Sequence, residues 1–284
     1  MLRKILVPVR GDGLVETVLG HAATLARRHK AHIVVAHCRA QAEDLMPYSM
    51  PLPAFARKTM LKQAQELANQ QESDLREELH LLAEKLELTE TEAAPGSRTT
   101  VEFVEETGRM VDVIKHNGRL ADLIVVAKPN RDSNVGTNSL KTGLFQTGRP
   151  VLMCPPRDTP PETFCDRIAV AWNGSLEASR MVALTLDLAA AAQQVSILSG
   201  GKGEPHGATA QELVDYYGLR GVTADIHRFE AQNPGVALLE KTREVGAGML
   251  VMGAYSLSHE RETLFGGNTQ AVVDSAEIPV ILAH

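Results

Sequence analysis

The chain has 284 residues, of which 44% are hydrophobic and 23% charged, and its net charge is −6 at pH 7. These proportions exclude a disordered chain, and the acidic balance offers no basic surface for nucleic acid. No apolar run approaches the roughly 20 residues of a membrane-spanning helix, and no signal sequence is recognised at the start. The three widely spaced cysteines lack a CxxC pair, so we expect reduced thiols in a cytoplasmic protein with no membrane partner.

In the first half of the chain, short apolar runs alternate with amphipathic helical patterns. Apolar runs without polar alternation are typical of parallel strands that are buried on both faces, and Ala and Leu at helical spacing predict the helices. In chain order, the sequence predicts a strand at 5–9, a helix at 14–29, a strand at 33–36, a helix at about 54–88, a strand at 101–104, a helix at 109–117, a strand at 123–126, a helix at 140–146 and a strand at 151–154.

The second half repeats this order. A basic residue, an apolar run, a polar residue and Gly occur at 4–11 and again at 167–174, and each half closes with Pro before an apolar run, at Pro150 and Pro279. The expected elements are a strand at 168–172, a helix at about 176–192, a strand at 195–198, a helix at about 208–217, a strand at 224–229, a helix at 236–245, a strand at 249–252, a helix at about 269–275 and a strand at 280–283.

This alternation predicts an α/β fold of two tandem doubly wound domains, each with a five-stranded parallel sheet. We place an N-terminal half at 1–156, a Pro-bearing linker at 157–165 and a C-terminal half at 166–284. The first half is longer because of residues 41–90, which we expect to cover a partner or the other half. A stripe of leucines in the long helix predicts core or inter-domain packing rather than a coiled coil; it comprises Leu61, Leu67, Leu75, Leu79 and Leu82.

In an open parallel sheet, ligands bind at the carboxyl ends of the strands, where the strand order reverses. With the first strand in the middle, this point lies between the first and fourth strands, so the loops after Trp172 and Met252 are the candidates. The second loop reads Gly253-Ala254-Tyr255-Ser256, nine further residues, and then Gly266-Gly267-Asn268-Thr269 before a helix.

Glycines in this loop are suited to phosphate binding. Gly253 allows a sharp turn, and Gly266 and Gly267 allow backbone N–H groups to point at a phosphate in front of a helix N-terminus. Asn268, Thr269 and Ser256 can add hydroxyl or amide donors. The alternative is that the Gly pair is only a flexible turn and that Thr269 is an ordinary helix cap.

These motifs together resemble the universal stress protein family, and the resemblance covers the whole chain as a tandem pair. It rests on Trp172-Asn173-Gly174-Ser175, on the loop from Gly253 to Thr269, and on the closing Ile278-Pro279-Val280-Ile281. It implies a Rossmann-like domain of the adenine nucleotide alpha hydrolase type that binds ATP. By the resemblance, Asn173 and the neighbourhood of Leu198 face the adenosine, while Gly253, Ser256, Gly266 and Gly267 bind the phosphates. The sequence departs from the family pattern at Asn173, where the family has an acidic residue, and at Ser256, where it has Gly.

The N-terminal half has a degenerate version of this loop. Ala127 replaces the first glycine, Arg10 stands at the acidic position, and only five residues separate Asn130 from Gly136. Lys128 and Arg131 can attract an anion, although solvated loop charges are the simpler interpretation. We therefore expect nucleotide in the C-terminal half only, Mg²⁺ only with that nucleotide, and no other metal.

The function expected from the resemblance is that of a stress-response regulator or sensor that binds an adenine nucleotide. No catalytic residues are recognised, so we expect no enzyme, or at most slow ATP hydrolysis. The N-terminal half then partners the C-terminal half as an intramolecular pseudo-dimer. The alternative is an interaction module that binds no nucleotide and acts through edge strands or domain contacts. The predicted edge strands at 151–154 and 280–283 can join the two halves within one chain, or two chains into a homodimer.

Overall fold

The computed structural model describes residues 1–9, 14–39, 53–92, 96–130, 136–156, 160–200, 207–254 and 267–284. The N-terminal half forms ten helices and strands within these ranges: β1 (Lys4–Val9), α1 (Val15–His29), β2 (His32–Arg39), α2 (Ala54–Lys85), β3 (Thr89–Glu90), β4 (Thr100–Thr107), α3 (Met110–Gly118), β5 (Leu123–Ala127), α4 (Thr137–Gln146) and β6 (Val151–Cys154).

The C-terminal half repeats the pattern: β7 (Arg167–Trp172), α5 (Leu176–Leu184), α6 (Leu186–Ala191), β8 (Gln194–Gly200), α7 (Ala210–Gly218), β9 (Ala224–Phe229), α8 (Pro234–Glu244), β10 (Met249–Gly253), α9 (Gly267–Ser275) and β11 (Val280–Ala283). The predicted α/β class and the tandem arrangement are therefore confirmed. The helix expected at 176–192 is interrupted at Thr185, whose hydroxyl donates to the Met181 carbonyl oxygen over 2.7 Å. Such back-bonding by Thr competes with the helix and bends it.

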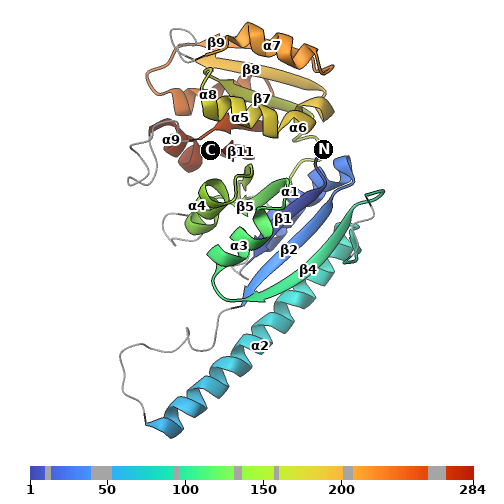
Figure 1. Ribbon diagram of the computed structural model, residues 1–284, viewed down its shortest axis with the longest axis vertical. Helices are drawn as coiled ribbons and strands as arrows, with labels where there is room; N and C mark the ends of the chain where they lie inside the picture. Colours follow the sequence, from blue (N-terminus) through green and yellow to red (C-terminus); the bar gives the residue numbers. More distant parts are fainter. Residues whose placement is uncertain are drawn as a thin grey trace.

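The strands of the described residues form one 11-stranded sheet in the order β3-β4-β2-β1-β5-β6-β11-β10-β7-β8-β9 (Figure 1). In each half the first strand lies between the second and the fourth, as predicted. Besides the five expected strands, the N-terminal half has the two-residue β3, which pairs with the start of β4. Every pairing is parallel except that of β6 with β11, where Leu152 lies opposite Ile281. The two predicted edge strands thus join the halves within one chain.

Two apolar layers cover the faces of this sheet. One contains the buried residues of α1, α2, α5, α6 and α7, and the other contains those of α3, α4, α8 and α9. Each layer continues from one half into the other, because the strands at the junction contribute alternate side chains to both: Leu152 and Ile281 to the first, Met153 and Leu282 to the second. The core therefore runs without a break across the β6–β11 junction.

The described part of the linker is packed into the first layer. Phe164 is buried, its ring meets the His21 ring edge-on at 5.5 Å, and the Arg28 guanidinium donates to the Asp166 carboxylate over 2.7 Å. A Cβ on Gly248 would stand 2.5 Å from the Phe164 carbonyl oxygen. The chain segment between the halves is therefore held against both of them.

Residues 41–90 are expected to cover a partner or the other half; residues 41–52 of this segment lie outside the described residues, and for the packed part of α2 the expectation is wrong. Leu75, Leu79 and Leu82 are buried in the core of their own half, together with residues of α1 and β4. The rest of α2 extends past the end of the sheet (Figure 1). Leu67, on that extension, is 58% exposed, so the predicted leucine stripe is packed only in its C-terminal part.

Candidate functional site

In the C-terminal half, the strand order reverses at β7, which has β10 on one side and β8 on the other. Val170 pairs with Val251 of β10 and with Ile197 of β8. The three strands are parallel, so the loops that follow them leave from the same edge of the sheet. This edge is where an open α/β sheet binds ligands.

The turn after β7 is built from local hydrogen bonds and a close backbone approach. The Asn173 Oδ1 atom accepts from the Ser175 N–H over 3.1 Å, and the Ser175 hydroxyl accepts from the Ala178 N–H over 3.2 Å. Ser175 is thus the N-cap of α5. Gly174 has a φ of +73°, and a Cβ there would stand 3.0 Å from the Gly207 nitrogen. These contacts fix the first turn of α5 at the end of β7.

Gly253, the last residue of β10, lies directly against this first turn. A Cβ on Gly253 would stand 2.7 Å from the Ala178 nitrogen and 2.7 Å from the Glu177 carbonyl carbon. Both are backbone atoms, so a side chain at this position would separate β10 from α5. The structure therefore brings Gly253, at the end of β10, against the turn after β7 that contains Asn173 and Ser175. The N-terminus of α5 lies beside Gly253, and the N–H groups of a first helical turn favour an anion. The sequence analysis did not include this helix end in the site.

The second glycine loop is described only in part. Ser256 and Gly266 lie outside the described residues. Gly267 begins the described part of α9 and is exposed with no atom near its Cβ position, Asn268 is exposed, and Thr269 is buried. A Cβ on Gly235, in the first turn of α8, would stand 2.5 Å from the Asn268 carbonyl oxygen. The first turns of α8 and α9 are therefore in contact at the same edge of the sheet.

Leu198 lies near the carboxyl end of β8, paired in register with Ala171 of β7. Its side chain is fully buried in the second apolar layer. The predicted neighbourhood of the adenosine therefore borders the core, and Leu198 itself presents no side-chain surface to the edge of the sheet.

The corresponding point of the N-terminal half has little space between β1 and β5, but a second pocket of about 380 Å³ lies beside it, with Ala127, Lys128 and Asn130 among its lining residues. The pocket between β1 and β5 has a volume of about 30 Å³, and its walls are largely apolar, with Val9, Val15 and Val126 among them. Gly136 has a φ of +83° and starts α4 close to Pro129. The space at this position is about that of one water molecule.

Lys128, in the degenerate loop, is neither a solvated charge nor a free anion-binding group. Its ammonium donates to the carbonyl oxygens of Asp274 over 2.7 Å and of Ala276 over 2.9 Å. These carbonyls end α9 of the other half, where a cation is favoured by the helix dipole. Burial lowers the pKa of Lys128, and the Asp274 carboxylate opposes that effect. Lys128 thus links the two halves, while Arg10 and Arg131 lie outside the described residues.

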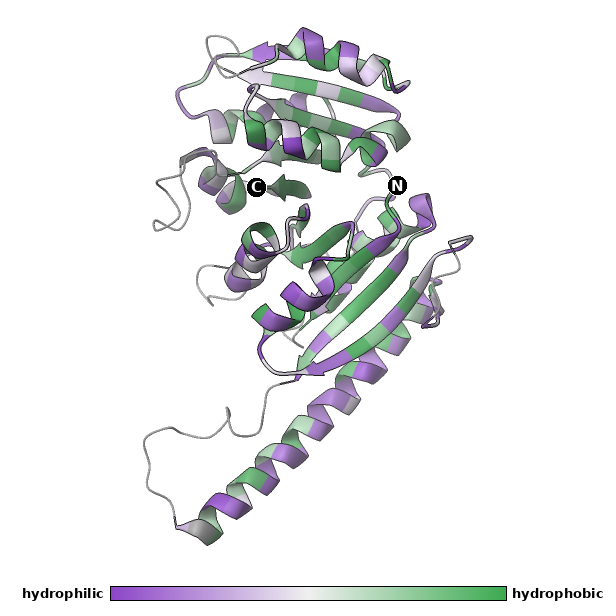
Figure 2. Ribbon diagram, in the orientation of Figure 1, coloured by the Kyte–Doolittle hydropathy of each residue, from purple (hydrophilic) through white to green (hydrophobic). Residues whose placement is uncertain are grey.

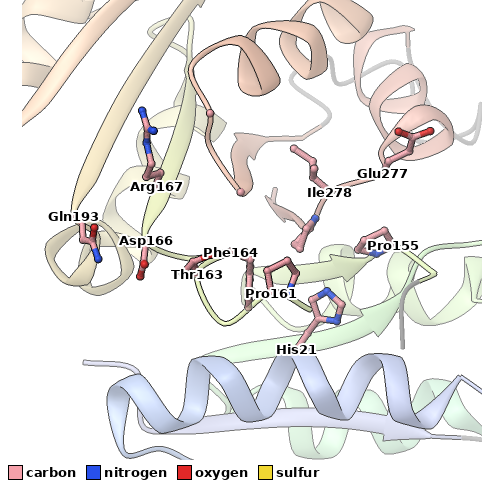
Figure 3. A pocket seen from close by; sticks show the side chains of 13 residues that line it. His21, Pro155, Pro161, Thr163, Phe164, Asp166, Arg167, Gln193, Glu277 and Ile278 are labelled. Atoms are coloured by element: carbon pink, nitrogen blue, oxygen red, sulfur yellow. The ribbon is translucent and has the colours of Figure 1, made fainter. Parts of the chain in front are cut away.

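A further pocket of about 280 Å³ lies between the halves, bounded by α1, the linker and the amino ends of β7 and β11 (Figure 3). The fold already uses its polar groups. His21 Nδ1 bonds to the Thr17 carbonyl oxygen at 2.7 Å, Arg167 donates to the Val245 carbonyl oxygen at 2.8 Å, and Glu277 accepts from Arg243 at 2.8 Å. The pocket is therefore better explained as a gap of the junction than as a ligand site.

Two other kinds of site have no support among the described residues. No group of three or more His, Cys, Asp or Glu side chains there is placed to hold a metal ion, and none of the described helices is long and apolar enough to cross a bilayer. The three cysteines form no disulfide, and burial raises the pKa of the Cys154 and Cys165 thiols.

The sequence matches the model of the universal stress protein family twice, over residues 1–134 and 165–284. The chain belongs to this family. No curated protein matches the sequence. A universal stress protein from Archaeoglobus fulgidus DSM 4304 is similar in structure, with a TM-score of 0.64 and 18% identity over 99% of this chain and 95% of that one. A protein of unknown function from Pseudomonas aeruginosa PAO1 matches with a TM-score of 0.56 and 18% identity, over 99% and 92% of the two chains.

A third similar structure is that of a putative universal stress protein from Pseudomonas aeruginosa UCBPP-PA14, with a TM-score of 0.55 and 17% identity over 99% of this chain and 93% of that one. These likenesses show that the tandem fold of this universal stress protein occurs in other chains of similar length. At such identities they show the fold alone, and the site is argued from the residues of this chain.

Proposed function

We propose that this universal stress protein binds an adenine nucleotide, ATP, in its C-terminal half and acts as a stress-response sensor or regulator. The observation that carries the proposal is the position of Gly253. It brings the end of β10 against the first turn of α5, at the point where the strand order reverses, and leaves no room for a side chain there. An arrangement of this kind supports phosphate binding by backbone N–H groups.

The residues of the chain have distinct roles in this proposal. Asn173, fixed in the turn after β7, faces the adenosine together with the backbone near Leu198. Gly253, Ser256, Gly266 and Gly267 approach the phosphates, and Asn268 and Thr269 lie in the first turn of α9 behind them. Mg²⁺ arrives with the nucleotide and is held by its phosphates. No general base is assigned, so we expect ATP hydrolysis to be slow or absent. The protein then acts as a sensor through the binding of the nucleotide and not through its cleavage.

The N-terminal half binds no nucleotide in this proposal. The pocket between β1 and β5, of about 30 Å³, is far smaller than the 300–1,000 Å³ of ordinary ligand sites. In the neighbouring pocket of about 380 Å³, the ammonium of Lys128, which could attract a phosphate, is already engaged with the end of α9. The proposal therefore predicts one nucleotide per chain. The first experiment is to denature freshly purified protein and to quantify the released nucleotide by chromatography, followed by titration of the emptied protein with Mg-ATP.

A pair of glycine variants tests the site itself. Gly267 and Gly218 are both exposed helix residues with no atom near their Cβ positions, so valine at either position leaves the fold intact. Gly267→Val should abolish ATP binding because it crowds the phosphates, and Gly218→Val should leave the affinity unchanged. Equal affinity in both variants would remove Gly267 from the site.

The alternative is an interaction module that binds no nucleotide, and the pairing within the sheet argues against its simplest form, the binding of a partner at the closing strands. Of the two routes expected for it, edge strands and domain contacts, the edges of β6 and β11 are not free, because these strands pair with one another inside the chain. A protein that is purified empty and fails to bind Mg-ATP would nevertheless favour this alternative, through surfaces other than these edges.

A further inference from the structure

Charged side chains gather where α2 first meets the sheet, at the carboxyl ends of β2 and β4. His37 of β2 pairs in register with Glu105 of β4, and Arg39 lies two residues further along β2, so the three side chains share one face of the strands. Val35, two residues before His37, belongs to the first apolar layer, to which α2 also contributes. Figure 2 shows hydrophilic residues at these strand ends, beyond the apolar middle of the sheet. The face that α2 covers therefore becomes charged where the strands end.

The Arg39 guanidinium joins β2 to both α2 and β4. Its Nη1 atom donates to the Glu72 carboxylate over 2.7 Å and reaches the Glu105 carboxylate at 3.5 Å, while Nη2 donates to the Asn69 side chain. The three charged side chains are only 18–24% exposed, so water screens them less than it screens surface charges. These contacts lie at the limit of the packed part of α2, because residues 55–74 contain no buried side chain in the described structure.

This cluster has two carboxylates for one guanidinium, and one carboxylate oxygen lacks a donor. The Glu105 Oε2 atom is buried and accepts no hydrogen bond within the described part of the chain. His37 Nδ1 is 4.0 Å from it, which is beyond hydrogen-bond length. A buried oxygen without a donor is costly. The Glu72 carboxyl is within hydrogen-bonding range of Glu105, so a proton held between the two carboxyls would give the oxygen a partner and make the cluster neutral.

The groups around the two carboxyls favour one proton between them. Burial and the Glu72 carboxylate raise the pKa of Glu105, against the opposing effect of Arg39. The hydrogen bond with Glu105 lowers the pKa of Glu72, and nearby positive charges act in the same direction. Those charges belong to Arg39 and to Arg76, which lies one turn further along α2. His37 also faces the pair, but burial lowers its pKa and keeps the ring neutral near pH 7.

We propose that Glu72 and Glu105 share one proton, and that this proton couples the docking of α2 on β2 and β4 to the pH. With the proton bound, one carboxyl donates to the other and the middle of α2 is held against the strands. When the proton is lost, two carboxylates face one another beside a single guanidinium, and their repulsion loosens the contact. The device requires no bound nucleotide, so it is independent of the nucleotide site.

The direction of the pH response follows from proton linkage. The docked helix binds the shared proton more readily than a detached helix, in which both glutamates are solvated. The stabilisation is therefore complete near the usual glutamate pKa of 4.5, and it is lost as the pH rises through the raised pKa of Glu105. Protonation of His37 acts in the opposite direction, because its buried ring is kept neutral in the docked state.

Hydrogen exchange of α2 tests the coupling. The amides of residues 70–80 are followed by mass spectrometry in the full chain between pH 5 and pH 8, with rates corrected for the intrinsic effect of pH. In Glu105→Gln the side-chain amide donates to Glu72 at every pH, and His37 is present in both proteins. Relative to this variant, protection in the wild type should fall as the pH rises, by about tenfold for each unit by which the pKa of Glu105 is raised. The same pH dependence in both proteins would overturn the proposal.

Glu106→Gln is the matched control. Glu106 is the next residue of β4, and its side chain lies on the other face of the strand, where it accepts from Asn117 Nδ2 over 2.7 Å. This variant should keep the pH dependence of the wild type in α2. Loss of the dependence in Glu106→Gln would show that the response does not belong to the carboxyl pair.

A second measurement needs no variant. The ¹³C resonance of the Glu105 carboxyl, followed by NMR in the wild-type protein, should titrate above the usual glutamate pKa of 4.5. A Glu105 carboxyl that titrates at or below this value holds no shared proton, and the proposal would then be wrong even if Glu105→Gln did not fold.

Discussion

The contact between Gly253 and α5 predicts a defined loss of stability when a single methyl group is added. In Gly253→Ala, the new Cβ would stand 2.7 Å from two backbone atoms, Ala178 N and Glu177 C, and 3.0 Å from the Glu177 Cβ. Backbone atoms cannot move aside as the end of a flexible side chain can, so α5 must shift away from β10. Overpacking destabilises a protein by about 1–3 kcal/mol, and a contact of 2.7 Å with two backbone atoms belongs in the upper part of that range. The lower entropy of the unfolded alanine chain subtracts up to about 1 kcal/mol, which leaves a net loss of about 1–2 kcal/mol.

The assay is thermal and urea unfolding of the nucleotide-free protein, so that ligand binding does not contribute. At roughly 2–4 °C per kcal/mol, Gly253→Ala should lower the melting temperature by about 2–8 °C. Gly267→Ala is the control: its Cβ meets open space, and it should leave stability unchanged or raise it by about 0.5–1 kcal/mol. A melting temperature for Gly253→Ala equal to that of the wild type would show that β10 and α5 are not packed as described, and would remove the support that this contact gives to the site.

Two further perturbations test the junction and the pH response. Lys128→Met removes two charge-assisted hydrogen bonds to the end of α9 and should lower the free energy of unfolding by about 2 kcal/mol, which is measured as a lower urea midpoint. The control is Lys62→Met: Lys62 is 79% exposed and pairs with Glu66 at i,i+4, so its loss should change the free energy of unfolding by less than about 0.5 kcal/mol. Equal midpoints for the two variants would contradict the bridging role of Lys128. Burial lowers the pKa of His29, so below pH 6.5 the unfolded chain binds a proton more readily than the folded one, and stability should fall as the pH drops from 7.5 to 5.5. His29→Gln should flatten this dependence; a slope identical to that of the wild type would exclude His29 as its source.

Much of the fold could be predicted from the sequence because its strands are continuous apolar runs and because each pattern occurs twice. Because of the duplication, most strands and helices are predicted twice, from two different stretches of sequence. The turn after β7 is indicated by Gly174 and Ser175, since Gly permits a turn and Ser caps a helix. The parallel pairing within each half follows from the alternation of strands and helices. Even the junction was anticipated as one of two uses of the closing strands, since an unpaired edge invites pairing.

What could not be predicted depends on contacts between distant residues. The partner of Lys128 lies 146 residues further along the chain, and nothing local distinguishes this lysine from a solvated one. The break at Thr185 depends on a hydroxyl bond that competes with the helix, and β3 is too short to leave a pattern. Leucines occur along most of α2, and the sequence does not show where the sheet beneath the helix ends, so the change from buried Leu75 to exposed Leu67 is visible only in the structure.

The antiparallel pairing of β6 with β11 also determines where the two carboxyl edges lie. Since all other pairings are parallel, the carboxyl ends of the N-terminal strands and those of the C-terminal strands leave from opposite edges of one sheet. A ligand at one edge and a partner at the other can therefore bind at the same time without steric conflict. The pairing is intramolecular and so persists at any dilution, whereas either half expressed alone would expose an apolar edge strand and become prone to aggregation.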